Sequence, residues 1–227
     1  MQHSHDRILT THVGSLPRER ELADLLIAQE AGQTVDLARL DRLAEAGVQR
    51  SVRAQVDAGL DVINDGEQPR VGFQTYVGQR LRGFDAVSER LPFSDFADYP
   101  DFAQVWAKRG MVMSKVFDAP AASAEVSYSD LGPANREFDM FDGALAQVPG
   151  RYREAFMTAA CPGIVCTTLG NKYYDSHEAY VRAVAREMRK EYELVHARGY
   201  VLQLDCPDLA MERHGQWQNA PLKEFQD

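Results

Sequence analysis

The stretch Gly199-Tyr-Val-Leu-Gln-Leu-Asp-Cys-Pro-Asp208 decides how the fold is interpreted. A long amphipathic pattern ends at Arg198-Gly199, where glycine can adopt the left-handed conformation that closes a helix, and a β-rich run then leads to Asp205. Pro207 ends that strand because proline cannot donate to a sheet ladder. Asp205 is therefore expected at the carboxyl end of a strand, where α/β folds place their ligands.

An earlier stretch has the same glycine-to-aspartate interval. Gly59-Leu-Asp-Val-Ile-Asn-Asp65 follows a helical pattern and continues into Gly66-Glu67. Two strands of one sheet would then bring acidic groups to the same edge. The alternative interpretation is structural, with both stretches forming αβ loops whose aspartates cap the next turn.

The composition is typical of one large globular domain. The 227 residues are 44% hydrophobic and 26% charged, which is enough for a substantial core. The formal net charge of -9 and the pI near 5.2 argue against general affinity for nucleic acid or an anionic membrane. No apolar run approaches the roughly 20 residues needed to span a bilayer, and no signal peptide is recognised. Three cysteines without a CxxC pair favour a reducing compartment, so a cytoplasmic location is expected.

Hydrophobic periodicity predicts alternating strands and helices. Strands are predicted over residues 8–13, 60–64, 111–116 and 125–128, within 155–169 with an interruption at 161–163, and in the run to Asp205. Helices are predicted over 19–30, 36–58, 73–81 and 138–148, and from an Asp175/Glu178 capping box to Arg198. Residues 119–123 are expected to be a connector. Such alternation favours a parallel sheet with helices outside it.

Residues 85–111 interrupt this pattern. The segment is aromatic and acidic and contains two prolines, so we expect an irregular excursion outside the sheet. A long ordered loop of this kind is either a lid or a surface insertion.

Three motifs together resemble the cobalamin-independent methionine synthase family, in particular its short single-barrel members. They are Thr11-His-Val-Gly-Ser-Leu-Pro-Arg18, Asp65-Gly-Glu-Gln-Pro-Arg70 followed by Tyr76-Val-Gly-Gln-Arg-Leu-Arg-Gly-Phe84, and Leu202-Gln-Leu-Asp-Cys-Pro-Asp-Leu-Ala-Met211. The resemblance implies an α/β fold of the (β/α)₈ TIM-barrel type. We expect residues 1–227 to form the amino-terminal part of one such barrel, incomplete and with about five strand–helix units.

The resemblance also implies a substrate site. Val13, Gly14 and Ser15 match the loop that holds the carboxylate of the amino-acid thiol. Glu67 and Asp205 match the acidic residues that bind its amino group. The implied reaction transfers a methyl group, from 5-methyltetrahydrofolate or a related donor, to a zinc-bound thiol such as homocysteine, because zinc stabilises the nucleophilic thiolate.

The chain departs from the family pattern at several points. Cys206 stands where methionine synthases have a glutamate, and Met211 stands near the position of a folate-contacting glutamate, which leaves the methyl donor open. The family's zinc ligands and proton donor are expected beyond Asp227, so the resemblance assigns no catalytic residue and no metal ligand within the chain. On this basis the chain is expected to be truncated and inactive alone.

Three other functions remain as alternatives. The first is alkyl transfer to another thiol such as coenzyme M, and the second is a non-catalytic barrel fragment that binds a small molecule. A decarboxylase of the uroporphyrinogen type is less favoured, because an acidic edge suits a cation better than a polycarboxylate.

Overall fold

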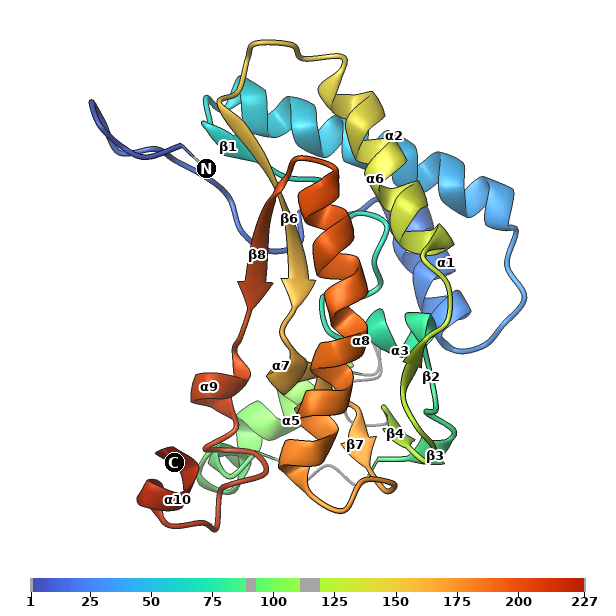
Figure 1. The fold of residues 1–227 in the computed structure, drawn as a ribbon, viewed down its shortest axis with the longest axis vertical. Helices are drawn as coiled ribbons and strands as arrows, with labels where there is room; N and C mark the ends of the chain where they lie inside the picture. Colours follow the sequence, from blue (N-terminus) through green and yellow to red (C-terminus); the bar gives the residue numbers. More distant parts are fainter. Residues whose placement is uncertain (1, 89–92, 111–118, 227) are drawn as a thin grey trace.

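A computed structural model describes residues 2–88, 93–110 and 119–226 (Figure 1). Its main sheet has three parallel strands in the order β1-β6-β8, formed by Val62–Ile63, Glu154–Ala160 and Val201–Asp205. The register pairs Val62 with Glu154 and Ala160 with Asp205. The parallel strands confirm the α/β class that the alternating pattern indicates.

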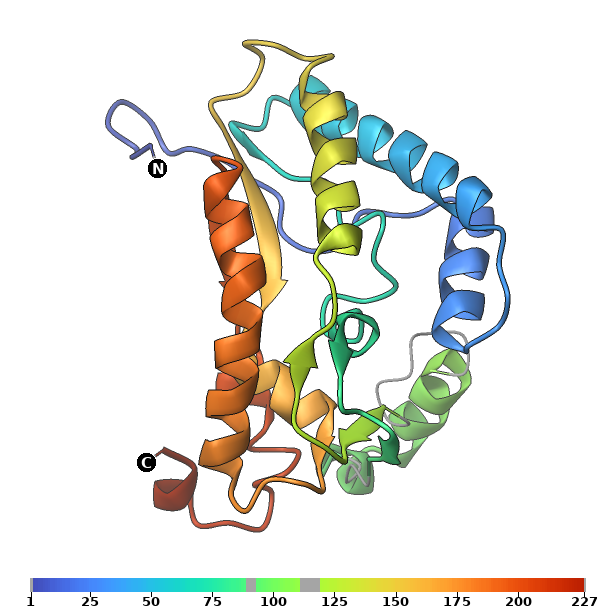
Figure 2. The same ribbon diagram turned by 45° about the vertical axis from the view of Figure 1, so that its right-hand side comes forward.

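Three long helices pack against this sheet, namely α2 (Leu37–Asp57), α6 (Gly132–Leu145) and α8 (His177–Ala197). Helix α1 (Arg20–Glu30) packs against α2. Figure 2 shows α8 alongside β6, with α6 between α8 and the α1–α2 pair. A buried cluster joins α2, α6 and α8 to β1 and β6 through side chains such as Val52, Phe138 and Met157. Burial of these apolar surfaces is the main force holding the layers together.

The remaining elements are short, except for the 11-residue helix α5. They are α3 (Val77–Arg80), β2 (Leu81–Arg82), β3 (Ala86–Val87), α4 (Asp95–Asp98), α5 (Pro100–Gly110), β4 (Pro120–Ala122), β5 (Ser127–Tyr128), α7 (Pro162–Thr168), β7 (Gly170–Asn171), α9 (Asp208–Met211) and α10 (Leu222–Gln226). Strand β2 pairs antiparallel with β5. Strands β3, β4 and β7 form a second small sheet, in which β4 and β7 are parallel.

The predicted strand at residues 8–13 is wrong. Only an isolated bridge from Thr11 to Val62 forms there. The neighbouring backbone is held differently, because the N–H of Thr10 donates to the Asp61 carboxylate at 2.9 Å and the Thr10 carbonyl accepts from two backbone N–H groups. A side chain thus competes with the sheet ladder for these groups.

Other boundaries also differ from the predictions. Residues 119–123 contain strand β4 rather than a simple connector, and the second half of 155–169 is helix α7 rather than strand. Within the segment 85–111, the described residues include β3, α4 and α5, so regular elements occur where an irregular excursion was expected. Residues 89–92 and 111 lie outside the described residues. The predicted helix at 73–81 begins later and gives way to β2, whereas the helix predicted at 138–148 begins earlier, at Gly132. The strand predicted at 111–116 lies outside the described residues.

Helix ends follow local side-chain chemistry. Asp36 caps α2 as predicted, since its carboxylate accepts from the N–H of Arg39 at 3.0 Å. The cap of α8 is Ser176, whose hydroxyl accepts from the N–H of Ala179, and not the predicted Asp175/Glu178 box. Gly199 has φ 82°, the left-handed conformation expected where α8 closes.

The described strands do not establish the predicted five-unit incomplete barrel, which stays a prediction. Three parallel strands form one sheet, and the second parallel pair belongs to a separate sheet. Within the described ranges, no helix combines the length and apolar character needed to cross a membrane.

Candidate functional site

A cavity of about 500 Å³ lies at the carboxyl ends of β1 and β8. It is lined by Gly14, Ser15, Glu67, Phe73, Gln203, Leu204, Asp205, Cys206 and Pro207. Four of the five residues predicted from the sequence are therefore brought together. The fifth, Val13, is half exposed and does not line the cavity.

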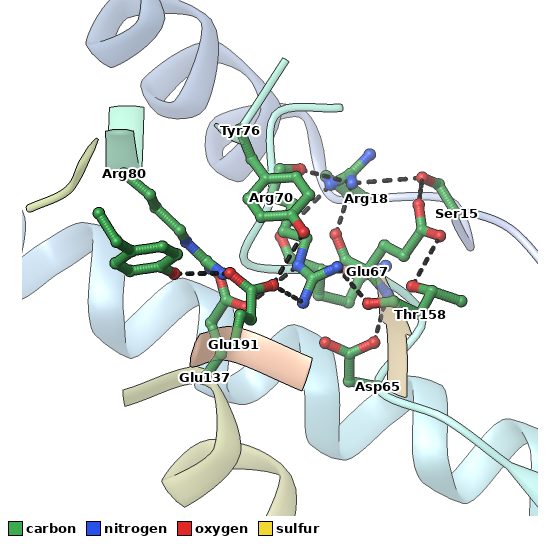
Figure 3. Close-up of polar contacts among 12 residues, drawn as sticks. Ser15, Arg18, Asp65, Glu67, Arg70, Tyr76, Arg80, Glu137, Thr158 and Glu191 are labelled. Carbon is green, nitrogen blue, oxygen red and sulfur yellow. Dashed lines mark hydrogen bonds and ion pairs between the residues drawn. The ribbon is translucent and has the colours of Figure 1, made fainter. Parts of the chain in front are cut away.

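The turn after β1 places Glu67. The Asn64 side-chain oxygen accepts from the N–H of Gly66 at 2.7 Å, and the Asp65 carboxylate accepts from the N–H of Glu67 at 2.9 Å. Gly66 has φ 67° and Glu67 has φ 53°, so two successive left-handed residues reverse the chain. This reversal aims the Glu67 side chain at Ser15 and Thr158 (Figure 3).

The Glu67 carboxylate is buried and hydrogen-bonded, and no cationic side chain of the described residues forms a salt bridge with it. It accepts from the Ser15 hydroxyl at 2.5 Å and from the Thr158 hydroxyl at 3.2 Å, and the residue is only 2% exposed. Arg18 lies nearby but donates to the backbone carbonyls of Glu67 and Arg70, at 2.5 and 2.6 Å. Arg18 therefore fixes the main chain of the turn, while its charge adds only a longer-range attraction to the Glu67 carboxylate.

Asp205 supplies the second acidic group. Its carboxylate accepts from the Gln203 amide at 2.7 Å. Burial raises the pKa of Asp205, the hydrogen bond from Gln203 opposes this rise, and the charge of Glu67 adds to it. In the described part of the chain, neither Glu67 nor Asp205 is in a salt bridge. One carboxylate from the turn after β1 and one from the end of β8 thus share one cavity, and no cation of the described residues forms a salt bridge with either.

Asp65 lies beneath the turn and is fully buried. Burial raises its pKa to about 6, although the charge of Arg70 opposes the rise. One of its oxygens binds the N–H of Glu67, and the other has no hydrogen-bond partner in the described structure. This carboxylate is therefore part of the support of the turn rather than of the cavity wall.

An ion-pair network lies behind the site and includes Arg70 and Arg80 with Glu137 and Glu191 (Figure 3). Sequence reasoning did not identify it, nor Thr158. The position of Glu191 in the sequence could have indicated the network, because Glu191 shares the apolar face of α8 with Met188 and Val195. A carboxylate on a buried face needs cationic or hydrogen-bonding partners.

The described residues do not fit a zinc site. No group of three or more His, Cys, Asp or Glu side chains in the described ranges is arranged to hold a metal ion. The cysteine on the cavity wall, Cys206, donates weakly to the Leu204 carbonyl at 3.7 Å.

Fold and cavity together define an α/β protein whose parallel strands end at a cavity of ligand size that carries two carboxylates. Residues 8–99 match the family model described as the catalytic domain of cobalamin-independent synthase. This match supports the resemblance to the cobalamin-independent methionine synthase family for the amino-terminal region of the chain.

Two individual proteins are also similar in sequence to part of this chain. The chain is 37% identical over 75 residues to the 5-methyltetrahydropteroyltriglutamate–homocysteine methyltransferase of Streptococcus mutans, a match covering 33% of this chain and 10% of that protein. It is 34% identical over 88 residues to the enzyme of the same name from Lactiplantibacillus plantarum, covering 37% of this chain and 11% of that protein. These matches thus span about a tenth of the relatives' length.

A solved structure resembles the fold over most of the chain. It is a B12-independent methionine synthase from Shewanella sp. W3-18-1 in complex with selenomethionine, with a TM-score of 0.61 and 21% identity. The similarity covers 88% of this chain and 52% of that one. At this identity the likeness shows the fold alone.

Proposed function

We propose that this chain carries the amino-acid-binding half of a methyltransferase site of the cobalamin-independent methionine synthase type. The acceptor is a thiol such as homocysteine, and the methyl donor is 5-methyltetrahydrofolate or a related compound. The observation that carries the proposal is the pair of carboxylates, Glu67 and Asp205, facing one cavity without a salt-bridge partner in the described residues. An ammonium group supplies the charge and the hydrogen-bond donors that this pair accepts.

The loop opposite suits the other end of an amino acid. Gly14 has φ 92°, and the backbone N–H groups of Gly14 and Ser15 make no hydrogen bond within the described structure. Free N–H groups in such a turn favour a carboxylate. Gly14 and Ser15 would therefore hold the carboxylate, while Glu67 and Asp205 hold the amino group. Val13, which the family resemblance also names, lies outside the cavity lining.

In this proposal the described residues bind substrate and do not carry out the methyl transfer. They bind and orient the amino-acid end of the thiol, and the Ser15 and Thr158 hydroxyls keep the Glu67 carboxylate in position. Family resemblance implies zinc as the group that activates the thiol, but the donor set described above does not fit it. Coenzyme M is a poorer acceptor for this site, since it has no ammonium group to meet the two carboxylates.

Isothermal titration of the chain with matched thiols tests the proposal. L-Homocysteine should bind at least about tenfold more tightly than 4-mercaptobutyrate, which lacks only the amino group, and than coenzyme M, because a hydrogen bond to a charged group contributes about 1.5–3 kcal/mol. Glu67→Gln and Asp205→Asn should each remove about tenfold or more of the homocysteine affinity, whereas Glu45→Gln, on an exposed part of α2, should not.

The pH dependence adds a second readout. Because burial raises the pKa of Asp205, homocysteine binding should weaken on acidification at a higher pH than an ordinary aspartate would cause. Equal affinity for homocysteine and 4-mercaptobutyrate, or parental affinity in both carboxylate variants, would contradict the proposal. Tight binding of coenzyme M instead would favour the other alkyl transfer.

A further inference from the structure

Two cysteines directly follow the paired ends of β6 and β8. Ala160 pairs with Asp205, and the ladder continues with a hydrogen bond from the N–H of Cys161 to the Asp205 carbonyl at 3.1 Å. Cys161 and Cys206 are thus neighbours across adjacent parallel chains. Such chains lie about 4.8 Å apart, and disulfides join Cα atoms about 4.4–6.8 Å apart. The backbone therefore brings the two residues within reach of a covalent bridge.

The side chains lie close together as well. Cys206 packs against the buried cluster that contains Cys161, and the Cys161 thiol donates to the Asp208 carboxylate at 3.1 Å. Burial raises the pKa of Cys161, and its interactions with Asp208 and the Cys206 thiol add to the rise. The Cys161 sulfur is accordingly held protonated, and its proton is directed at the Asp208 carboxylate.

The two thiols differ in access. Cys206 is half-buried and lines the cavity described above, whereas Cys161 is 6% exposed. The third cysteine, Cys166, is 2% exposed on α7 and does not line that cavity. A small oxidant that enters the cavity therefore meets Cys206 first.

We infer that Cys161 and Cys206 form a reversible dithiol–disulfide pair, a modification site on the cavity wall that reacts with a peroxide. The Cys206 sulfur attacks hydrogen peroxide, the O–O bond breaks, and a sulfenic acid and one water form. The Cys161 sulfur then attacks the Cys206 sulfur, the S–S bond forms and the S–O bond breaks. Asp208 takes the Cys161 proton and passes it to the departing hydroxide, giving a second water. Two thiols are oxidised and one peroxide is reduced.

The bridge changes the cavity in a definite way. It joins Cys206, which follows the last residue of β8, Asp205, on the cavity wall, to Cys161, the residue that caps α7. It also removes the Cys206 thiol from the wall. A dithiol reductant reverses both changes.

Mass spectrometry of the folded chain tests the inference. After treatment with hydrogen peroxide, the parent chain should lose the mass of two hydrogens, and peptide mapping should find Cys161 linked to Cys206. Cys166→Ser, the control, should form the same bridge. In Cys161→Ser the reaction should stop at the sulfenic acid, which dimedone labels at Cys206.

Three results would contradict the Cys161–Cys206 bridge, and mass spectrometry distinguishes them. A link through Cys166, a disulfide between two chains, or dimedone labelling of Cys206 in the parent chain in place of the bridge would overturn the inference. Circular dichroism of each variant before treatment checks that the fold is retained. Because the parent chain and Cys166→Ser already carry the main test, a folding defect in Cys161→Ser would not leave the question open.

Discussion

At the scale of single residues, the candidate site rests on an unusual backbone. Glu67 is the one residue other than glycine with a positive φ in the described part of the chain, at 53°. This conformation costs roughly 1–2 kcal/mol for a residue with a side chain. Contacts of the turn offset that cost, since the N–H of Glu67 binds Asp65 and its carbonyl accepts from Arg18. The strained residue is also the one that presents a carboxylate to the cavity.

Gly66 is required by space as well as by conformation. A Cβ there would lie 2.8 Å from the Ser51 hydroxyl oxygen and 2.9 Å from the Ser51 Cβ, at φ 67°. Gly59 has a similar φ of 78° with nothing within 4 Å, so it is a matched control. We expect Gly59→Ala to cost about 1 kcal/mol of unfolding free energy and Gly66→Ala about 2–4 kcal/mol, because the crowding adds to the backbone strain.

Urea unfolding of the two variants measures this difference. Equal losses would show that φ alone accounts for both glycines and that the turn can move away from α2. A loss of homocysteine binding in Gly66→Ala, with binding retained in Gly59→Ala, would further connect the turn to the cavity.

At the scale of elements, long periodic segments could be predicted and short ones could not. The four-residue spacing of Leu40, Ala44, Val48, Val52 and Val56 predicted α2, and all five side chains are buried. Repeated apolar positions over many residues leave one helical face to bury, so the sequence determines the element. The same reasoning applied to α8, where Val184, Met188 and Val195 are buried.

The misassigned element α7 shows why short runs fail. Its sequence has the β-branched and apolar character of a buried strand, and periodicity cannot separate the two over seven residues. Local capping decides the outcome. The Cys161 sulfur accepts from the N–H of Ile164 at 3.4 Å, and Pro162 stands at the first helical position, which proline favours.

The candidate site could be predicted only in part, because the sequence pattern indicates strand ends but not the order of strands in the sheet. Glu67 and Asp205 lie next to predicted strand ends, and parallel strands bring such ends together. Thr158 lies inside β6, which separates β1 from β8 in the sheet. Its contact with Glu67 depends on strand order, which the sequence pattern does not reveal.

The start of α8 gives a prediction at this scale, because the sequence and the structure name different caps. The Ser176 hydroxyl accepts from the N–H of Ala179 at 3.1 Å, whereas the sequence pattern favoured Asp175. Ser176→Ala should lower the unfolding free energy by about 1 kcal/mol, the usual value of an N-cap. Asp175→Ala should change it by no more than about 0.5 kcal/mol. Thermal or urea unfolding measures both changes. If Asp175→Ala lost more unfolding free energy than Ser176→Ala, Asp175 would be the N-cap, as the sequence pattern predicted.

At the scale of the whole molecule, buried charges connect elements that are far apart in sequence. Arg80 of α3 contacts both Glu137 of α6 and Glu191 of α8. Arg70 binds Glu137 at 3.1 Å and donates to the Thr158 carbonyl of β6 at 2.7 Å, which extends the network toward the candidate site. Breaking a buried ion pair by removing one partner costs far more than the pair contributes, since a charge is left uncompensated.

Glu191 is the most informative position in this network. Burial alone would raise its pKa, but the charges of Arg80 and Arg70, with hydrogen bonds from Tyr128 and Arg80, outweigh burial and hold the pKa at about 2. A carboxylate whose folded pKa lies below its unfolded value stabilises the protein above the unfolded pKa. That stabilisation is lost as the pH falls through the folded pKa, here from roughly 4.3 to about 2.

Glu191→Gln should therefore destabilise the chain by about 3–5 kcal/mol at pH 7, because Arg80 and Arg70 are left with one carboxylate. The difference from the parent should shrink as the pH is lowered from 4 toward about 2, where the parent also loses the charge. Glu178→Gln, on the exposed face of the same helix, should change stability by no more than about 0.5 kcal/mol. Urea unfolding of the parent chain and both variants at several pH values measures these differences in unfolding free energy. If Glu191→Gln lost as much stability near pH 2 as at pH 7, the charge of Glu191 would not stabilise the fold.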